Sequence, residues 1–260
     1  MNPHLARIRI FPLKSLDGVE LDESVVRKGR GLAGDREFCL VDENDNFVNT
    51  KRMGASLVRI RSEFDQVFGE IILRDGDDTA TFSLERDRRG IEQWFEKRLE
   101  KPVRLKRDTE RGFPDDTAAP GPTVISTATL RAVTSWFSGC DLDQTGRRLR
   151  ANLEIDGVPA FWEDRLFGPA GREVPFRIGE VTIKGINPCA RCAVPSRDPA
   201  TGEIHDPAFA KAFAHQRLKT LPAWAEKSRF DHFYRLAVNT VIPESEAGKV
   251  ISVYDDVVAP

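Results

Sequence analysis

The feature that most constrains the fold is a series of short apolar or alternating runs near the start of the chain. The runs cover residues 7–11, 19–26, 37–41, 47–49, 57–60, 70–73 and 81–84, and turn signals such as Asp17-Gly18 and Asp75-Gly76 separate them. Short strands at regular spacing with tight turns favour a barrel or sandwich over alternating βαβ units. We therefore expect this part of the chain to be β.

Helical patterns are few in the rest of the chain. Ile91, Trp94, Phe95 and Leu99 have the spacing of a surface helix, which Pro102 ends. The Pro-, Gly- and Asp-rich residues 109–122 indicate a surface loop or domain junction. Beyond it we expect strands over residues 124–126, 149–155, 176–178, 181–186, 236–242 and 250–254, a helix over 130–137 capped by Ser126 or Thr127, and helical segments over 207–217 and 221–226. The predicted class is mainly β with a few helices (α+β), in two domains of residues 1–108 and 109–260.

Composition excludes several classes of protein. The 260 residues carry 39 basic and 41 acidic side chains and a net charge of −2, so no global field favours nucleic acid. No apolar run is long enough to cross a membrane, and the N-terminus lacks the apolar stretch of a signal peptide. We expect a cytoplasmic monomer that binds neither nucleic acid nor membrane.

A glycine-rich stretch, GRGLAG at residues 29–34, matches the letters of a dinucleotide-binding motif. That motif must leave a strand and open a helix, whereas the sequence that follows alternates like a strand and then turns. The glycines are better explained by a tight turn. Arg36, just after this turn, could reach into a cavity.

Two of the four cysteines, Cys189 and Cys192, form a C-x-x-C pair. Together with His205 they copy three positions of a zinc site, but the next histidine, His215, is too distant for a fourth ligand. A redox dithiol would need a helix N-terminus, which the flanking prolines disfavour. Two inert thiols and a single reactive thiolate at Cys192 also remain open. The neighbouring Arg191 and Arg197 would support that thiolate electrostatically, and a thiolate suits a soft metal.

Two basic clusters fit a bound anion. Lys14-Ser15 ends the first expected strand, and alternation along residues 149–155 places Arg148, Arg150 and Asn152 on one face. Arginine forks and lysine charges suit phosphate, although a solvated strand face would also explain the second cluster. The residues alone indicate an anion-binding β protein with one activated thiolate.

The segments FPLKSLDG, GLAGDREF, RLRANLEIDG and PCARCAVPSRDPATGE occur in this order along the chain. The series resembles the MOSC-domain proteins that carry an N-terminal MOSC-type β-barrel. It is most similar to the branch with the mitochondrial amidoxime reducing component and its bacterial relatives. The resemblance implies an N-terminal MOSC-type β-barrel-like domain followed by a MOSC β-barrel domain.

The resemblance also implies a molybdenum cofactor between the two halves. Its metal would be held by Cys192, because the cofactor's dithiolene supplies two further sulfurs, and Cys189 would be structural. The residues implied to hold the rest of the cofactor are Lys14, Ser15, Arg150, Asn152, Ala190 and Arg191, with Arg36 and Thr240 as further candidates.

The chain departs from the family pattern at several of these positions. Gly34 stands where eukaryotic relatives have a cofactor-contacting arginine, which Arg36 could replace. Ala190 replaces a serine and Thr240 a tyrosine, and Pro195-Ser196 stand where two threonines are common. These changes bear on how the cofactor and substrate are held.

The implied activity is that of a molybdenum-dependent oxidoreductase which reduces N-hydroxylated compounds such as hydroxylamines and amidoximes. The metal would cycle between Mo(VI) and Mo(IV), and Asp198 is a candidate proton relay. Because the sequence ends at Pro260 without a four-cysteine cluster motif, we expect a separate ferredoxin, flavoprotein or cytochrome as electron donor. The alternatives are a sulfur carrier with a persulfide on Cys192, and a cofactor-binding module without turnover.

Overall fold

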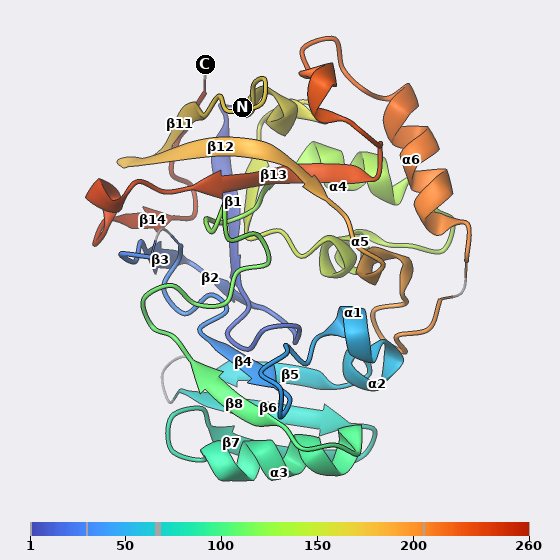
Figure 1. Ribbon diagram of the computed structural model, residues 1–260. Coiled ribbons are helices and arrows are strands. Elements are labelled where there is room, and N and C mark those ends of the chain that lie inside the picture. Colours follow the sequence, from blue (N-terminus) through green and yellow to red (C-terminus); the bar gives the residue numbers. More distant parts are fainter. Residues whose placement is uncertain (1, 30, 66–68, 205, 260) are drawn as a thin grey trace.

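The computed structural model describes residues 2–29, 31–65, 69–204 and 206–259. Arg30 of the glycine-rich stretch and His205 of the zinc hypothesis lie outside these ranges. Two lobes lie one above the other in Figure 1. The upper lobe is built on an eight-stranded sheet, and the lower lobe on a three-stranded and a two-stranded sheet. The predicted mainly β class with a few helices is confirmed.

The upper sheet combines strands from both ends of the chain. Its order is β15-β11-β12-β13-β9-β10-β1-β2. In chain order the strands are β1 (His4–Ile10), β2 (Val19–Leu21), β9 (Val124–Ser126), β10 (Leu153–Asp156), β11 (Val174–Ile178), β12 (Val181–Ala190), β13 (Arg235–Val241) and β15 (Val257–Val258). Neighbouring strands are antiparallel except for the parallel pair β9 and β10. Since β1 pairs with both β10 and β2, the N-terminal segment is an integral part of this sheet.

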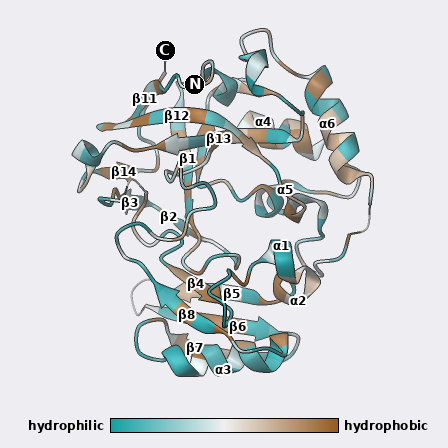
Figure 2. Ribbon diagram, in the orientation of Figure 1, coloured by the Kyte–Doolittle hydropathy of each residue, from teal (hydrophilic) through white to brown (hydrophobic). Residues whose placement is uncertain are grey.

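The lower lobe has its own apolar core. Strand β4 (Phe38–Val41) pairs with β8 (Arg104–Arg107), and β5 (Arg61–Asp65), β6 (Glu70–Asp75) and β7 (Asp78–Ser83) form a meander. Helix α3 (Arg88–Leu99) buries Ile91 and Phe95 in the same core cluster as Leu73 of β6. The short helices α1 (Thr50–Met53) and α2 (Ala55–Val58) lie near the upper lobe (Figure 1), and α1, which buries none of its residues, is hydrophilic (Figure 2).

The upper lobe is completed by helices and a small two-stranded sheet. It contains helices α4 (Thr127–Thr134), α5 (Leu142–Leu149) and α6 (Phe209–Lys219) and the 3₁₀ turns η1 (Trp162–Arg165), η2 (Val194–Ser196), η3 (Lys227–Arg229) and η4 (Glu244–Glu246). Strand β3 (Glu23–Val25) pairs with β14 (Val250–Ser252). Within the described ranges, the structure contains no helix with the length and apolar character needed to cross a membrane.

Several expected elements are confirmed. The helix that ends before Pro102 is α3, and the strand over residues 124–126 is β9. Ser126 caps α4, because its Oγ accepts a hydrogen bond from the Thr129 N–H at 3.1 Å. The glycine-rich stretch is a turn, in which Arg27 N–H donates to the Gly31 carbonyl at 2.9 Å and Gly34 has a φ of 75°.

The expected strand over residues 149–155 is wrong at its first half. Residues 142–149 form α5, which begins at the Asp141–Gln144 capping box, and Arg150 ends it with a left-handed φ of 50°. The strand β10 begins only at Leu153. Arg148 and Arg150 therefore come from a helix and its C-cap, not from one face of a strand.

Three shorter predictions are also wrong. Residues 57–58 end α2 and residues 59–60 lie beyond it, since a short apolar run does not distinguish a strand from a buried helix turn. Residues 47–49 make one isolated bridge, from Phe47 to Val41, before Asn49 caps α1. Residues 221–226 form a turn closed by the Ala225 N–H and the Pro222 carbonyl instead of a helix.

Candidate functional site

A cavity of about 840 Å³ opens where the two lobes meet. Segments that lie far apart in the sequence form its walls, among them the turn after β1, residues 47–51, the loop between β8 and β9, the end of α5, the end of β12 with the loop that follows, and β13. The turn after β1 runs back to β2 of the upper sheet and contacts β4 of the lower lobe on the way, where Leu13 bridges to Phe38. The cavity thus depends on this contact between the lobes.

The wall of this cavity is strongly basic. Among the described residues, ten lysines and arginines and three aspartates line it, although the whole chain has a net charge of −2. Concentrated positive charge in a cavity with low-dielectric walls attracts anions. A small anionic molecule is therefore the kind of ligand that the cavity favours.

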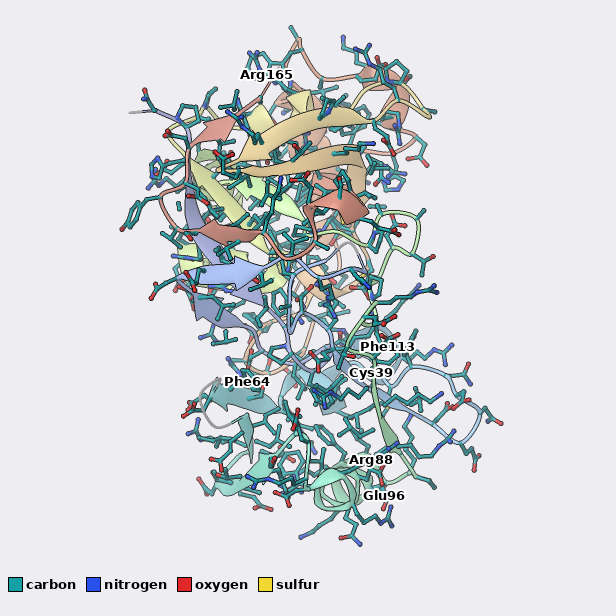
Figure 3. The ribbon with its side chains drawn as sticks, turned by 90° about the vertical axis from the view of Figure 1, so that its left-hand side faces the viewer. Cys39, Phe64, Arg88, Glu96, Phe113 and Arg165 are labelled. Carbon is teal, nitrogen blue, oxygen red and sulfur yellow. The ribbon has the colours of Figure 1, made fainter. Side chains whose placement is uncertain are left out.

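Lys14 projects into this cavity from the turn after β1. Its backbone N–H donates to the Phe38 carbonyl at 2.8 Å, and Ser15 turns the chain with a φ of 76°. The Lys14 Nζ donates to the Phe113 carbonyl at 2.8 Å and to the carboxylate of Asp115. Figure 3 shows Phe113 at the level where the lobes meet. Burial lowers the pKa of Lys14, and the charge of Asp115 opposes this.

Arg36 and Arg150 share one aromatic ring. Their Cζ atoms lie 5.1 Å and 4.1 Å from the ring centroid of Phe11. Arg36 donates to the carboxylate of Asp35, whereas the guanidinium of Arg150 makes no hydrogen bond or ion pair within the described part of the chain. Burial and the nearby charge of Arg36 lower the pKa of Arg150 to about 10. A partly buried cation with no carboxylate in direct contact is costly, so Arg150 is placed to receive an anionic group.

Asp115 places one carboxylate among these cations. Its Oδ1 accepts from Lys14 Nζ, and its Oδ2 lies 3.9 Å from Arg36 Nε. Burial acts to raise the pKa of Asp115, but the charges of Arg36 and Lys14 lower it to about 2. Sequence reasoning treated residues 109–122 as a loop and missed Asp115. The available signal was an Asp-Asp pair in a chain segment between two basic clusters.

Cys192 lies on the loop after β12 with an exposed side chain. Its Sγ accepts a hydrogen bond from the Val194 N–H at 3.5 Å. Cys189, within β12, is half-buried, and Arg191 Nη1 donates to its Sγ at 3.2 Å. Arg191 also donates to the Leu149 carbonyl at the end of α5. Both thiols line the cavity, and Cys192 is the more accessible of the two.

The loop beyond Cys192 is held from two sides. Arg148 donates to the carbonyls of Pro195 and Arg197 at 3.0 Å and 2.6 Å, and Arg197 lies against Gly54, at the junction of α1 and α2. Asp198 closes a turn by accepting from the Ala200 N–H at 2.8 Å. It lines a second, smaller cavity of about 50 Å³ beside the large one.

Seven of the nine residues predicted to hold a cofactor line the large cavity: Lys14, Ser15, Arg36, Arg150, Ala190, Arg191 and Cys192. The other two are buried, and their polar groups are used within the protein. Asn152 Oδ1 accepts from the Thr123 N–H at 3.1 Å, and its Nδ2 donates to the Arg9 carbonyl at 2.9 Å. Thr240 Oγ1 donates to the Pro122 carbonyl at 2.6 Å. Both side chains thus shape the wall from behind.

A zinc site was one of the alternatives for the cysteine pair. In the described ranges, no three His, Cys, Asp or Glu side chains gather in a way that could hold a metal ion. His205, the third position of that hypothesis, lies outside the described residues. What the described site contains is one accessible thiol and a set of cations within one cavity.

Comparison with known families accounts for nearly the whole chain. Residues 2–138 match the model of the MOSC N-terminal beta barrel domain, and residues 123–257 match the model of the MOSC domain. The two matches overlap in the region of β9 and α4. No curated protein matches the sequence. The closer likeness to the mitochondrial amidoxime reducing component stays a prediction.

Proposed function

The chain belongs to the family of MOSC-domain proteins, and on that premise we propose that it is a molybdenum-cofactor-dependent oxidoreductase that reduces N-hydroxylated compounds such as hydroxylamines and amidoximes. MOSC domains are associated with binding of the molybdenum cofactor. The observation that carries the proposal is the pairing, in one cavity, of the accessible Cys192 thiol with the uncompensated cation Arg150.

The donor groups fit this cofactor at both ends. A thiolate is a ligand suited to a soft metal, and Cys192 offers one sulfur to a metal whose other two sulfurs come with the cofactor. Lysine and arginine suit the cofactor's phosphate, and Lys14, Arg36 and Arg150 supply that set at the junction with the lower lobe. A soft ligand and a group of cations on one cavity wall match a ligand with a metal at one end and a phosphate at the other.

Each part of the site has a distinct task in this proposal. The Val194 N–H stabilises negative charge on the Cys192 sulfur through its hydrogen bond. Arg148 and Arg191 tie the cysteine loop to α5 and so fix the position of that sulfur. The basic side chains near Phe11 orient the cofactor by its anionic end. When bound, the cofactor supplies the two-electron chemistry that breaks an N–O bond.

We include in the proposal a separate protein as electron donor, of the ferredoxin, flavoprotein or cytochrome type. The first assay therefore uses a chemical reductant in its place. The protein is produced in a host that makes the cofactor, its molybdenum content is measured, and the reduction of benzamidoxime or N-hydroxyurea by a reduced viologen dye is followed.

The decisive variants are Cys192→Ser and Cys189→Ser, which make the same chemical change at neighbouring thiols. We expect Cys192→Ser to lose molybdenum and at least about 100-fold of the activity, since metal ligands are seldom replaceable. Cys189→Ser should retain both. Wild-type protein without molybdenum, or a Cys192→Ser variant that keeps the metal and the activity, would contradict the proposal.

The exposure of Cys192 also suits a sulfur carrier that bears a persulfide. Intact-mass measurement separates the two functions. A mass increment of one sulfur on Cys192, removed by reductant and found without pterin, would favour the carrier. Bound pterin and molybdenum without reductase activity would favour a cofactor-binding module.

A further inference from the structure

We propose that Asp115 is the resident counter-anion of the cavity, which the phosphate group of an incoming ligand must displace from Lys14 and Arg36. The residue would thereby select for a doubly charged phosphate over singly charged anions. This inference rests on the proposed function for the identity of the ligand. The displacement itself concerns only side chains of this chain.

The carboxylate of Asp115 lies where an anionic ligand would bind. It contacts the Nζ of Lys14 directly and lies 3.9 Å from the Nε of Arg36. Its charge also acts on Arg150, the cation that has no partner of its own within the described residues. The side chain is nevertheless 76% exposed, facing open space. A ligand phosphate would therefore compete for these cations with a carboxylate that is already bound.

The backbone on both sides of Asp115 is tied to the cavity wall. Phe113 N–H donates to the Arg36 carbonyl at 2.8 Å, and its own carbonyl accepts from Lys14 Nζ. Further along, Gly121 N–H donates to the Thr240 carbonyl at 2.8 Å. A side-chain rotation of Asp115 can thus clear the cations while the ends of the loop remain in place.

The charges favour a phosphate over a monoanion in this competition. A carboxylate contributes one negative charge, whereas a phosphate monoester carries nearly two near neutral pH and presents three strong acceptor oxygens. Such a group can satisfy Lys14, Arg36 and Arg150 together. An anion such as acetate would only exchange one carboxylate for another and would gain little.

The neighbouring Asp116 provides a matched control. It lines the same cavity, but its Oδ1 accepts from the Ala118 N–H at 3.0 Å and its Oδ2 from Asn239 Nδ2 at 3.2 Å. Asp116→Asn removes the same charge as Asp115→Asn without freeing Lys14. The difference between the two variants therefore separates displacement of a counter-anion from a change in net charge.

The test is calorimetric titration of the cofactor-free full chain with inorganic phosphate, and with acetate at the same ionic strength. We expect Asp115→Asn to bind phosphate about tenfold more tightly than wild type, as removal of one competing charged hydrogen bond predicts, and to gain measurable acetate binding. Asp116→Asn should change phosphate affinity by less than about threefold. Equal gains in both variants, or no gain in Asp115→Asn, would overturn the proposal.

A second measurement guards against an indirect effect on folding. Thermal unfolding of each variant without phosphate should give midpoints close to that of wild type, and added phosphate should raise the midpoint most in Asp115→Asn. Asp115→Asn should give the same gain in phosphate affinity when it is introduced into Cys192→Ser, because the cysteine change tests the metal and leaves the anion site intact. The two proposals can therefore fail separately. Protein that lacks molybdenum but shows the phosphate result would contradict only the proposed function, and protein that holds molybdenum without the phosphate result would contradict only the role of Asp115.

Discussion

Two clusters of charged side chains differ in where they lie in this molecule and in how their charges are balanced. The cavity cluster consists of Lys14, Arg36 and Arg150, with Asp115 among them. The sealed cluster consists of Glu163, Asp164 and Arg217 in the upper lobe, all almost fully buried. The first has an excess of positive charge and opens to a cavity, whereas the second is closed.

Two of the three groups in the sealed cluster form an ion pair, Arg217 with Asp164. Arg217 donates to the carboxylate of Asp164 and its Cζ lies 4.6 Å from the ring centroid of Phe161. Thr129 Oγ1 donates to Glu163 Oε2 at 3.0 Å. Burial, and next the charge of Asp164, raise the pKa of Glu163 to about 7, so Glu163 takes up its proton as the pH falls through neutral.

The difference separates charges that stabilise the fold from charges that bind a ligand. A closed cluster with a paired arginine and aspartate is not accessible to a ligand. Substitutions that break this pair should therefore lower the free energy of unfolding and leave ligand affinity unchanged. An open, unbalanced cluster costs stability and is relieved only by an anion. Substitutions in the two clusters should therefore have opposite effects on stability and on binding.

The largest effect is expected for Arg217→Met. It leaves Asp164 buried without its cationic partner, which typically costs about 3–5 kcal/mol. Urea unfolding should show this loss, and phosphate affinity at pH 7 should stay near the wild-type value. Arg147→Met is the control, because its partner Asp143 is a surface residue and such pairs contribute less than about 0.5 kcal/mol. A similar loss of stability in both variants would show that the Arg217–Asp164 pair contributes no more than a surface ion pair.

The next largest effect concerns pH. An acid whose pKa is raised on folding binds more protons folded than unfolded, so its contribution is full below the unfolded value and is lost as pH rises. For Glu163 the window runs from the ordinary 4.5 to about 7, and the loss is at most roughly 3 kcal/mol. Unfolding free energies of wild type and Glu163→Gln, measured from pH 4.5 to 8, should diverge with rising pH in favour of the variant. Parallel curves would show that Glu163 does not titrate in this way.

The smallest effect, and the sharpest contrast, is expected for Arg150→Met in the cavity cluster. Phosphate affinity should fall about tenfold, which corresponds to the loss of one charge-assisted contact. The free energy of unfolding should be unchanged or higher, because a cation held near Arg36 without a partner is removed. Calorimetric titration measures the fall in phosphate affinity, and urea unfolding of the same samples measures the change in the free energy of unfolding. If the variant has a lower free energy of unfolding and normal phosphate affinity, Arg150 stabilises the fold, as the sealed cluster does, and does not bind the anion.

The sequence motifs point to residues that line one cavity, although the local structure expected for one of them is wrong. Lys14 and Cys192 line it, as do Arg150 and Arg191. However, Arg150 reaches it from the C-cap of a helix, and the Asp141–Gln144 capping box that marks the start of that helix was visible in the sequence. Alternation over a few residues predicts a strand here, whereas the capping residues correctly indicate a helix.

The position of Asp115 was beyond any local pattern. Its placement depends on Lys14, about a hundred residues earlier in the sequence, and on the loop ties at Phe113 and Gly121. Composition described residues 109–122 correctly as a loop and could not say what the loop faces. Long-range contacts of this kind are set by the packing of the two lobes, which no short window of sequence contains.

The route of the chain through the upper sheet also sets an order of assembly during synthesis. Strand β1 pairs with β10, so residues 4–10 must wait until residues 153–156 have left the ribosome before the sheet can close. The lower lobe, from β4 to β8, is continuous in sequence and can fold during that interval. The turn with Lys14 joins β1 to β2 within the upper sheet and packs Leu13 and Leu16 into the core of the lower lobe. The wall of the basic cavity, which includes Cys192, can therefore be completed only after the chain has been made as far as that residue.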